Sequence, residues 1–329
     1  MKKFILFLVL LTGLSACNDK NSKVLLPTSI GRYNELMVVI NQSDWDGKIG
    51  VELKKVIASN VLGLPQPEPQ FTITHIPHQG FSGFLKQNRN ILSIEQADTN
   101  ELVIDYDLYA KPQIYMRIKG TDKSAIAQLI KDNKDKIIQA FKEADIKQIQ
   151  KDLQQHVHDN KLIKTFKKQG FSFKIPIDYT QIDDAGDFIW YRKDIQVYNS
   201  KINGSMNLIA YTLPLEVPFG QIKDSISAIR DSIGKKHIPG ALDGSYLITE
   251  KAYAPHVFDT TLAGKKAYKV LGKWEVYKDY KAGPFVSYVV ADEKQQRIIV
   301  VEGFAYAPVV KKRDIMFELE GIIRSLRIR

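Results

Sequence analysis

The sequence of 329 residues contains a single cysteine, Cys17, close to its N-terminus. One cysteine cannot form an intrachain disulfide or ligate an iron–sulfur cluster by itself. The folded part of the chain follows Cys17 and has no cysteine, which excludes a cysteine nucleophile and a cysteine-ligated zinc site there. We therefore expect a fold without disulfides, stabilised by an apolar core that a chain of this length is able to bury.

The sequence also lacks long apolar runs and several catalytic signatures. Its longest uninterrupted apolar run is Phe4–Leu11, whereas a membrane-spanning helix needs about 20 such residues. No P-loop, dinucleotide-binding or G-x-S-x-G motif occurs. Ser232 and Lys235 match the S-x-x-K motif of penicillin-binding enzymes, but the S-D-N and K-T-G motifs of that mechanism are absent. The sequence thus predicts no catalytic residue and no cofactor.

The N-terminus carries the features of a secretory signal. Two lysines form a positive start, the apolar run follows, and the small residues Ser15 and Ala16 precede Cys17. The segment Leu14–Cys17 resembles the lipobox of bacterial lipoproteins, in which the signal is cleaved before the cysteine and the cysteine is acylated. This resemblance implies that residues 1–16 are removed and that Cys17 carries lipid such as palmitate, which anchors the protein to a membrane.

We therefore expect a lipid-anchored protein of the cell envelope, with residues 17–30 as its lipidated tether. Asn18 differs from the aspartate associated with inner-membrane retention, and no acidic export signal follows it, so we favour the outer membrane, facing the periplasm. Removing Lys2 and Lys3 lowers the basic count from 47 to 45 against 37 acidic residues, a net charge of +8. This charge suits anionic headgroups or acidic polymers, or simply solubility, and export argues against a nucleic-acid partner.

Residue patterning predicts an α+β fold with two sheet-plus-helix domains, an N-terminal domain at 31–160 and a C-terminal domain at 161–329. A long amphipathic region from Lys123 to about His158 predicts one helix on the N-terminal sheet, or two helices with a break near Glu143–Asp145. Helices are also predicted at 50–59, 81–88, 219–233 and 311–326. Strands are predicted at 35–40, 71–76, 90–94, 112–118, 187–192, 196–199, 207–211, 246–250, 265–276, 285–291 and 297–306. Hairpin turns are predicted at Asn203–Gly204 and Gly283–Pro284.

Six short segments resemble, in their order, an uncharacterised lipoprotein family of Bacteroidetes, the domain of unknown function numbered four-eight-three-seven. They are Leu64–Phe71, Arg89–Leu92, Lys236–Gly240, Gly272–Trp274, Gly283–Val286 and Glu302–Pro308. The resemblance covers essentially the whole mature chain, implies an envelope lipoprotein and supplies no functional residues.

A second resemblance concerns the C-terminal half. Its Phe173–Pro176 opening (F-x-I-P), its Phe188–Tyr191 strand (F-x-W-Y) and its final helix are similar to the Mog1/PsbP type of α/β/α sandwich. The fold of that type is mostly a scaffold for binding and assembly, but a fold does not determine a function.

Several polar motifs admit a functional interpretation, and each also admits a structural one. His75 and His78, His156 and His158, and the acidic loop Asp183–Asp187 contain metal-ligand residue types, but none has a complete ligand set, so we predict no metal site. Aromatic residues alternate with lysines between 273 and 288, which suits either a binding surface or a packed core with exposed lysines. The candidate binding surface consists of Trp274, Tyr277, Tyr280, Phe285, Lys311, Lys312 and Arg313.

These observations predict a non-enzymatic binding or assembly module, held at the membrane by covalent lipid, with an envelope protein or polymer as its partner. Two alternatives remain open. One is a hydrolase of envelope material whose site is too dispersed to recognise, so the sequence does not decide whether the protein is an enzyme. The other is a carrier of an apolar ligand held between the sheet and its helices.

Overall fold

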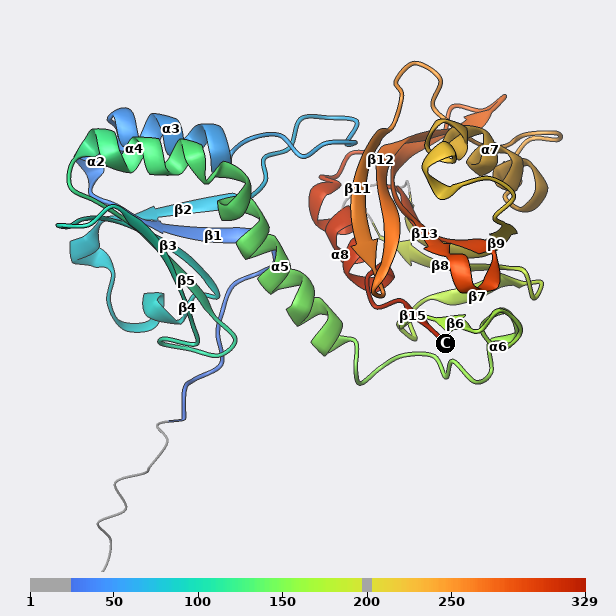
Figure 1. The fold of residues 1–329 in the computed structure, drawn as a ribbon, viewed down its shortest axis with the longest axis horizontal. Coiled ribbons are helices and arrows are strands. Elements are labelled where there is room, and N and C mark those ends of the chain that lie inside the picture. The colour runs from blue at the N-terminus through green and yellow to red at the C-terminus, as the bar shows by residue number, and fades with distance from the viewer. Residues whose placement is uncertain (1–24, 197–202) are drawn as a thin grey trace, which may run out of the picture.

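The computed structural model describes residues 25–196 and 203–329, which form two large sheets with their helices (Figure 1). The predicted two-domain α+β layout is thereby confirmed. Cys17, the signal segment and most of the strand predicted at 196–199 lie outside the described residues. Among the residues that the structure describes, no helix has both the length and the apolar content that a membrane span requires.

The N-terminal domain is built on a five-stranded sheet in the order β2-β1-β3-β5-β4. Its strands are parallel except for β4, which pairs antiparallel with β5 at one edge. The central strands are buried on both faces and are rich in apolar residues. The edge strand β4 is partly exposed, has only the short apolar run Leu102–Ile104, and was not predicted. The bounds are β1 Glu35–Val39, β2 Thr72–Ile76, β3 Asn90–Gln96, β4 Glu101–Tyr106 and β5 Ile114–Gly120.

Different elements cover the two faces of this sheet. Helices α3 (Lys48–Ile57) and α4 (Lys123–Asp132) cover one face, and the short helix α2 (Gln42–Trp45) precedes α3 (Figure 1). On the other face, a small cluster around Tyr115 packs against the 3-10 segments η2 (His78–Gly80) and η3 (Gly83–Gln87) and their neighbours.

The long amphipathic region forms two helices, but the predicted break near Glu143–Asp145 is wrong. Helix α4 ends at Asn133, whose side-chain amide donates to the carbonyl of Leu129 at 2.9 Å, and α5 then runs over Lys134–Asp152. Glu143 and Asp145 lie inside α5, and each binds a polar partner outside the helix. These polar residues in the middle of the helix therefore indicate contacts with other elements and not the end of a helix.

Helix α5 packs against both domains. Its first half contributes Ile137 and Phe141 to the N-terminal core, as expected for a helix on its own sheet. Its second half instead packs Ile146 and Ile149 against Phe317 of the C-terminal domain. One rigid helix thus spans the junction between the two cores, and Figure 1 shows it running between them.

The C-terminal domain is built on an eight-stranded sheet in the order β10-β12-β13-β14-β9-β8-β7, with β11 paired to β12. All of these pairings are antiparallel. The bounds are β7 Thr180–Asp184, β8 Phe188–Ile195, β9 Gly204–Pro214, β10 Tyr246–Thr249, β11 His256–Leu262, β12 Lys265–Tyr277, β13 Ala282–Asp292 and β14 Arg297–Tyr306.

Helices cover both faces of this sheet, which confirms the predicted α/β/α sandwich. Helix α8 (Arg313–Ile323) and the short α6 (Lys164–Gln169) pack on one face, and α7 (Ile226–His237) packs on the other. Small elements complete the domain: η4 Phe219–Gln221, η5 Lys223–Ser225, η6 Glu293–Gln295, and the two-stranded pair of β6 Phe171–Ser172 with β15 Arg327–Ile328.

Both predicted hairpin turns are wrong. Gly204 begins β9 opposite Ile195, so Asn203 and Gly204 are not a two-residue turn. Gly283 lies within β13 opposite Trp274, and a Cβ atom there would lie 2.0 Å from the carbonyl oxygen of Ala305. Glycine is therefore required at 283 because the neighbouring strand approaches closely, not because the chain turns.

Candidate functional site: the interdomain cleft

A cleft of 660 Å³ lies between the two domains. Residues 61–64 and α5 line it from the N-terminal side, and β11, β12, β13 and α8 line it from the C-terminal side. Its volume falls within the range of about 300–1,000 Å³ typical of small-molecule sites, which often occur between domains. This cleft is the candidate functional site.

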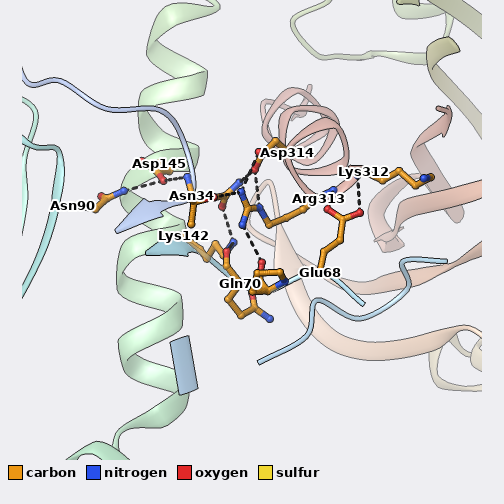
Figure 2. Close-up of polar contacts among 11 residues, drawn as sticks. Asn34, Glu68, Gln70, Asn90, Lys142, Asp145, Lys312, Arg313 and Asp314 are labelled. Carbon is orange, nitrogen blue, oxygen red and sulfur yellow. Dashed lines mark hydrogen bonds and ion pairs between the residues drawn. The ribbon is translucent and has the colours of Figure 1, made fainter. Parts of the chain in front are cut away.

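A buried carboxylate fixes one end of this junction. Glu68 accepts hydrogen bonds from the backbone amides of Lys312 (2.7 Å) and Arg313 (3.0 Å), and Figure 2 shows it reaching the start of α8. Only 5% of Glu68 is exposed. A carboxylate at this position satisfies amides that the helix cannot pair and interacts favourably with the helix dipole. The proline-rich segment 64–69 thus connects the N-terminal domain to the start of α8.

Arg313 strengthens the same junction. Its guanidinium donates to the carbonyl of Pro69 at 3.1 Å and to the Thr72 hydroxyl at 2.9 Å, and it also pairs with Asp314 at 2.8 Å. The ammonium of Lys312 donates to the side chain of Gln66 at 3.0 Å. Both side chains are buried rather than exposed, and Arg313 also lines the cleft.

Asn34 connects the N-terminal sheet to both helices of the junction (Figure 2). Its backbone amide donates to Asp145 of α5 at 2.9 Å, and its side-chain amide donates to Asp314 of α8 at 2.8 Å. Its side-chain oxygen accepts a hydrogen bond from the ammonium of Lys142 at 2.6 Å. Asn34 is fully buried with φ of 60°, a left-handed conformation that asparagine tolerates better than most residues.

Lys142 is the most perturbed cation of the cleft. Its ammonium also donates to the carbonyl of Gln70 at 2.7 Å and lies over the rings of Phe71 and Phe317, at 4.6 and 5.0 Å from their centroids. The pKa of Lys142 is lowered to about 7. Burial is the largest cause and the charge of Arg313 acts in the same direction, while nearby carboxylates oppose both.

Two carboxylates of the cleft, those of Glu320 and Glu143, are paired with cations. Glu320 accepts from Lys269 at 2.5 Å and from the hydroxyl of Tyr288 at 2.7 Å. Burial alone would raise the pKa of Glu320, but Lys269 and these hydrogen bonds outweigh burial, and the pKa is lowered. Arg324 donates two parallel hydrogen bonds to Glu143, at 2.7 and 2.8 Å, which join α8 to α5.

The structure separates the aromatic members of the predicted binding surface. Trp274 and Phe285 are buried in the core beneath α7, and Phe285 also lines the interdomain cleft. Tyr277 and Tyr280 are exposed at the turn between β12 and β13, and Lys311 is exposed elsewhere, before α8. Alternation along β12 explains the difference, since even positions from 270 to 276 are buried and odd positions are partly exposed.

The histidine and acidic motifs have structural partners. The Nε2 atoms of His75 and His78 lie 2.8 Å from the carbonyls of Ile40 and Ile94, respectively. Asp184 accepts from the first backbone amides of α6, at 2.6 and 2.8 Å, and so stabilises the start of that helix. Within residues 25–196 and 203–329, no three His, Cys, Asp or Glu side chains are arranged to hold a metal ion.

Residues 158–325 match the family model described as Domain of unknown function (DUF4837). The chain belongs to this family. Residues 29–154 match a separate model, Domain of unknown function (DUF8532). The predicted resemblance is therefore confirmed for the C-terminal half, whereas the segments Leu64–Phe71 and Arg89–Leu92 lie in the part that matches the second model.

Comparison with curated proteins gave no match for this DUF4837 protein. Among solved structures, it is similar to LpqN of Mycobacterium tuberculosis, described as involved in cell envelope biogenesis, with 15% identity over 48% of this chain and 82% of LpqN, at a TM-score of 0.29. It is also similar to the Ran-binding protein Mog1p of Saccharomyces cerevisiae, with 8% identity over 48% of this chain and 90% of Mog1p, at a TM-score of 0.32.

Proposed function

We propose that this protein is a lipid-anchored binding protein of the cell envelope, and that its ligand occupies the interdomain cleft. The lipobox-like segment ending at Cys17 supports the anchor and the location. The observation that carries the binding role is the cleft itself, because it is large enough for a ligand and both domains contribute its walls.

The lining favours a ligand with an apolar body and a hydrogen-bonding end. Apolar side chains from both domains form much of the walls, and the basic and acidic groups are largely paired with each other. Such a lining offers no strong excess of charge to attract a highly charged ligand. Apolar residues of the lining include Leu62, Leu64, Ile138, Phe258, Leu271 and Met316.

The state of the carboxylates in the interdomain cleft favours ligand binding over hydrolysis. A carboxyl group that acts as a general acid near neutral pH needs a raised pKa. The carboxylates of Glu320 and Glu143 are instead paired with cations. Burial does raise the pKa of Glu302, but Glu302 lies beneath α7, bound to Arg230 beside a space of only 10 Å³.

The small space beneath α7 argues against one form of the predicted carrier function, in which an apolar ligand is held between the sheet and this helix. A volume of 10 Å³ between the sheet and α7 is about that needed for one water molecule, so an apolar ligand has no room there. The interdomain cleft does have room for an apolar ligand, and the carrier alternative then becomes a case of the present proposal.

Native mass spectrometry of the lipidated full-length protein, isolated in mild detergent from its own envelope, tests this function. We expect a defined non-covalent adduct on the wild type. Leu62→Trp, which adds bulk at the cleft, should remove the adduct. Tyr106→Trp, at an exposed position on the edge strand β4, is the matched control and should retain it. An adduct that survives Leu62→Trp unchanged, or a wild type without any adduct, would contradict the proposal.

A further inference from the structure

The cationic side chains that line the cleft differ in their partners. Lys269 pairs with Glu320, Arg324 with Glu143, and Arg313 with the adjacent Asp314. Lys142 has no carboxylate within 4.0 Å among the residues that the structure describes. Its nitrogen donates only to neutral oxygens, the Asn34 side chain and the Gln70 carbonyl.

This arrangement suits a neutral amine. An amine has two hydrogens, which are enough for the two acceptors, and its lone pair remains free, whereas an ammonium carries a third hydrogen. The rings of Phe71 and Phe317 exclude water from the nitrogen on two sides, and they belong to different domains. Lys142 therefore keeps both of its hydrogen bonds when it loses its proton.

The surrounding charges act in both directions. Arg313 of α8 disfavours a positive charge on Lys142, while Asp145 of α5 and both Asp314 and Glu320 of α8 favour it. Burial is the largest effect and favours the neutral amine. The pKa of about 7 leaves a large fraction of Lys142 unprotonated at neutral pH, and a desolvated lysine of this kind is an activated nucleophile.

We propose that Lys142 is a covalent attachment site, at which its amine condenses with the aldehyde or ketone group of a ligand in the interdomain cleft. This inference rests on the proposed function, because the ligand must enter that cleft. The lone pair of Nζ attacks the carbonyl carbon and forms a carbinolamine. The carbonyl oxygen then leaves as water with both hydrogens of the amine, and a carbon–nitrogen double bond remains. The condensation needs no oxidant and no reductant.

The test uses the full-length wild-type protein in mild detergent, with hexanal as the probe and sodium cyanoborohydride to reduce the imine. Peptide mass spectrometry measures the labelling rate of Lys142 and of Lys147, an exposed lysine on the same helix. At pH 7 we expect Lys142 to label at least about tenfold faster than Lys147, because an unperturbed lysine has a pKa of about 10.4. The labelling rate of Lys142 should rise as the pH passes through about 7.

Equal labelling of Lys142 and Lys147 at pH 7 would overturn the inference, and the comparison within one chain requires no variant that could misfold. The two proposals fail separately. A native adduct that is lost in Leu62→Trp, together with equal labelling, would retain the cleft as a ligand site and remove Lys142 as its attachment point. Selective labelling of Lys142 without any native adduct would retain the reactive amine and remove the proposed ligand.

Discussion

Replacing Glu68 by alanine should loosen the junction between the two domains. The substitution removes the carboxylate that accepts from the backbone amides of Lys312 and Arg313, at 2.7 and 3.0 Å, in a buried position. It leaves the first turn of α8 without these acceptors. The side chain is also the point at which the proline-rich segment of the N-terminal domain meets the C-terminal domain.

The expected magnitude follows from these two hydrogen bonds. A helix cap contributes about 0.5–2 kcal/mol, and a hydrogen bond to a charged group about 1.5–3 kcal/mol. Water will replace part of what is lost once the junction opens, so we expect Glu68→Ala to destabilise the closed arrangement by about 2–4 kcal/mol. Glu68→Gln keeps one acceptor oxygen and should cost less, about 1 kcal/mol.

Native-state hydrogen exchange is the suitable assay, because a two-domain chain need not unfold in a single step. The amides of Lys312 and Arg313 should exchange about 30-fold faster or more in Glu68→Ala, since 1.4 kcal/mol corresponds to a factor of ten. Amides in the core strands β13 and β14 should change little. Glu216→Ala, at an exposed glutamate, is the control. Unchanged exchange at the start of α8 would refute the reasoning.

Three further predictions concern buried groups. The pKa of Lys142 is lowered to about 7 on folding, so above that pH the folded state binds fewer protons than the unfolded state. The free energy of unfolding should therefore rise with pH between about 7 and 10. Urea titrations of Lys142→Met should show a flatter rise. Arg230 and Glu302 form a buried ion pair at 2.8 Å. In denaturant unfolding, Arg230→Met or Glu302→Leu alone should lower the free energy of unfolding by about 3–5 kcal/mol, and the double variant should lower it by less than the sum of the two. Gly283→Ala should cost about 2–3 kcal/mol or more, because its Cβ would lie 2.0 Å from the carbonyl oxygen of Ala305; an unchanged melting temperature would contradict that contact.

Local patterns in the sequence were sufficient for most of the fold. The run Arg297–Tyr306 is buried along nearly its whole length, and its β-branched residues mark it as a central strand. The period of apolar residues in Lys311–Leu326 likewise predicted α8 with its core-facing side. Edge strand β4 was missed because its apolar run, Leu102–Ile104, is short and is flanked by Glu101 and Asp105.

The candidate site depends on contacts that no local pattern encodes. Lys142 and Asn34 are 108 positions apart, and Glu68 and Lys312 are 244 positions apart. The apolar period of α5 defines its buried side but not which domain covers each half. In β12 the structure follows the second of the two interpretations, a packed core with exposed lysines. Trp274 alternates with Lys273, and a period of two places their side chains on opposite faces.

In-cell photo-crosslinking tests the central claim that the interdomain cleft is the binding site. A photoreactive residue would replace Phe258, which lines the cleft and is 41% exposed, or Tyr280, which is fully exposed at the β12–β13 turn outside it. The account predicts a discrete crosslinked product from position 258, none from position 280, and loss of the product when Cys17→Ala removes the proposed anchor. A product from position 280 with none from position 258 would contradict the account and place the interaction at the exposed tyrosines instead.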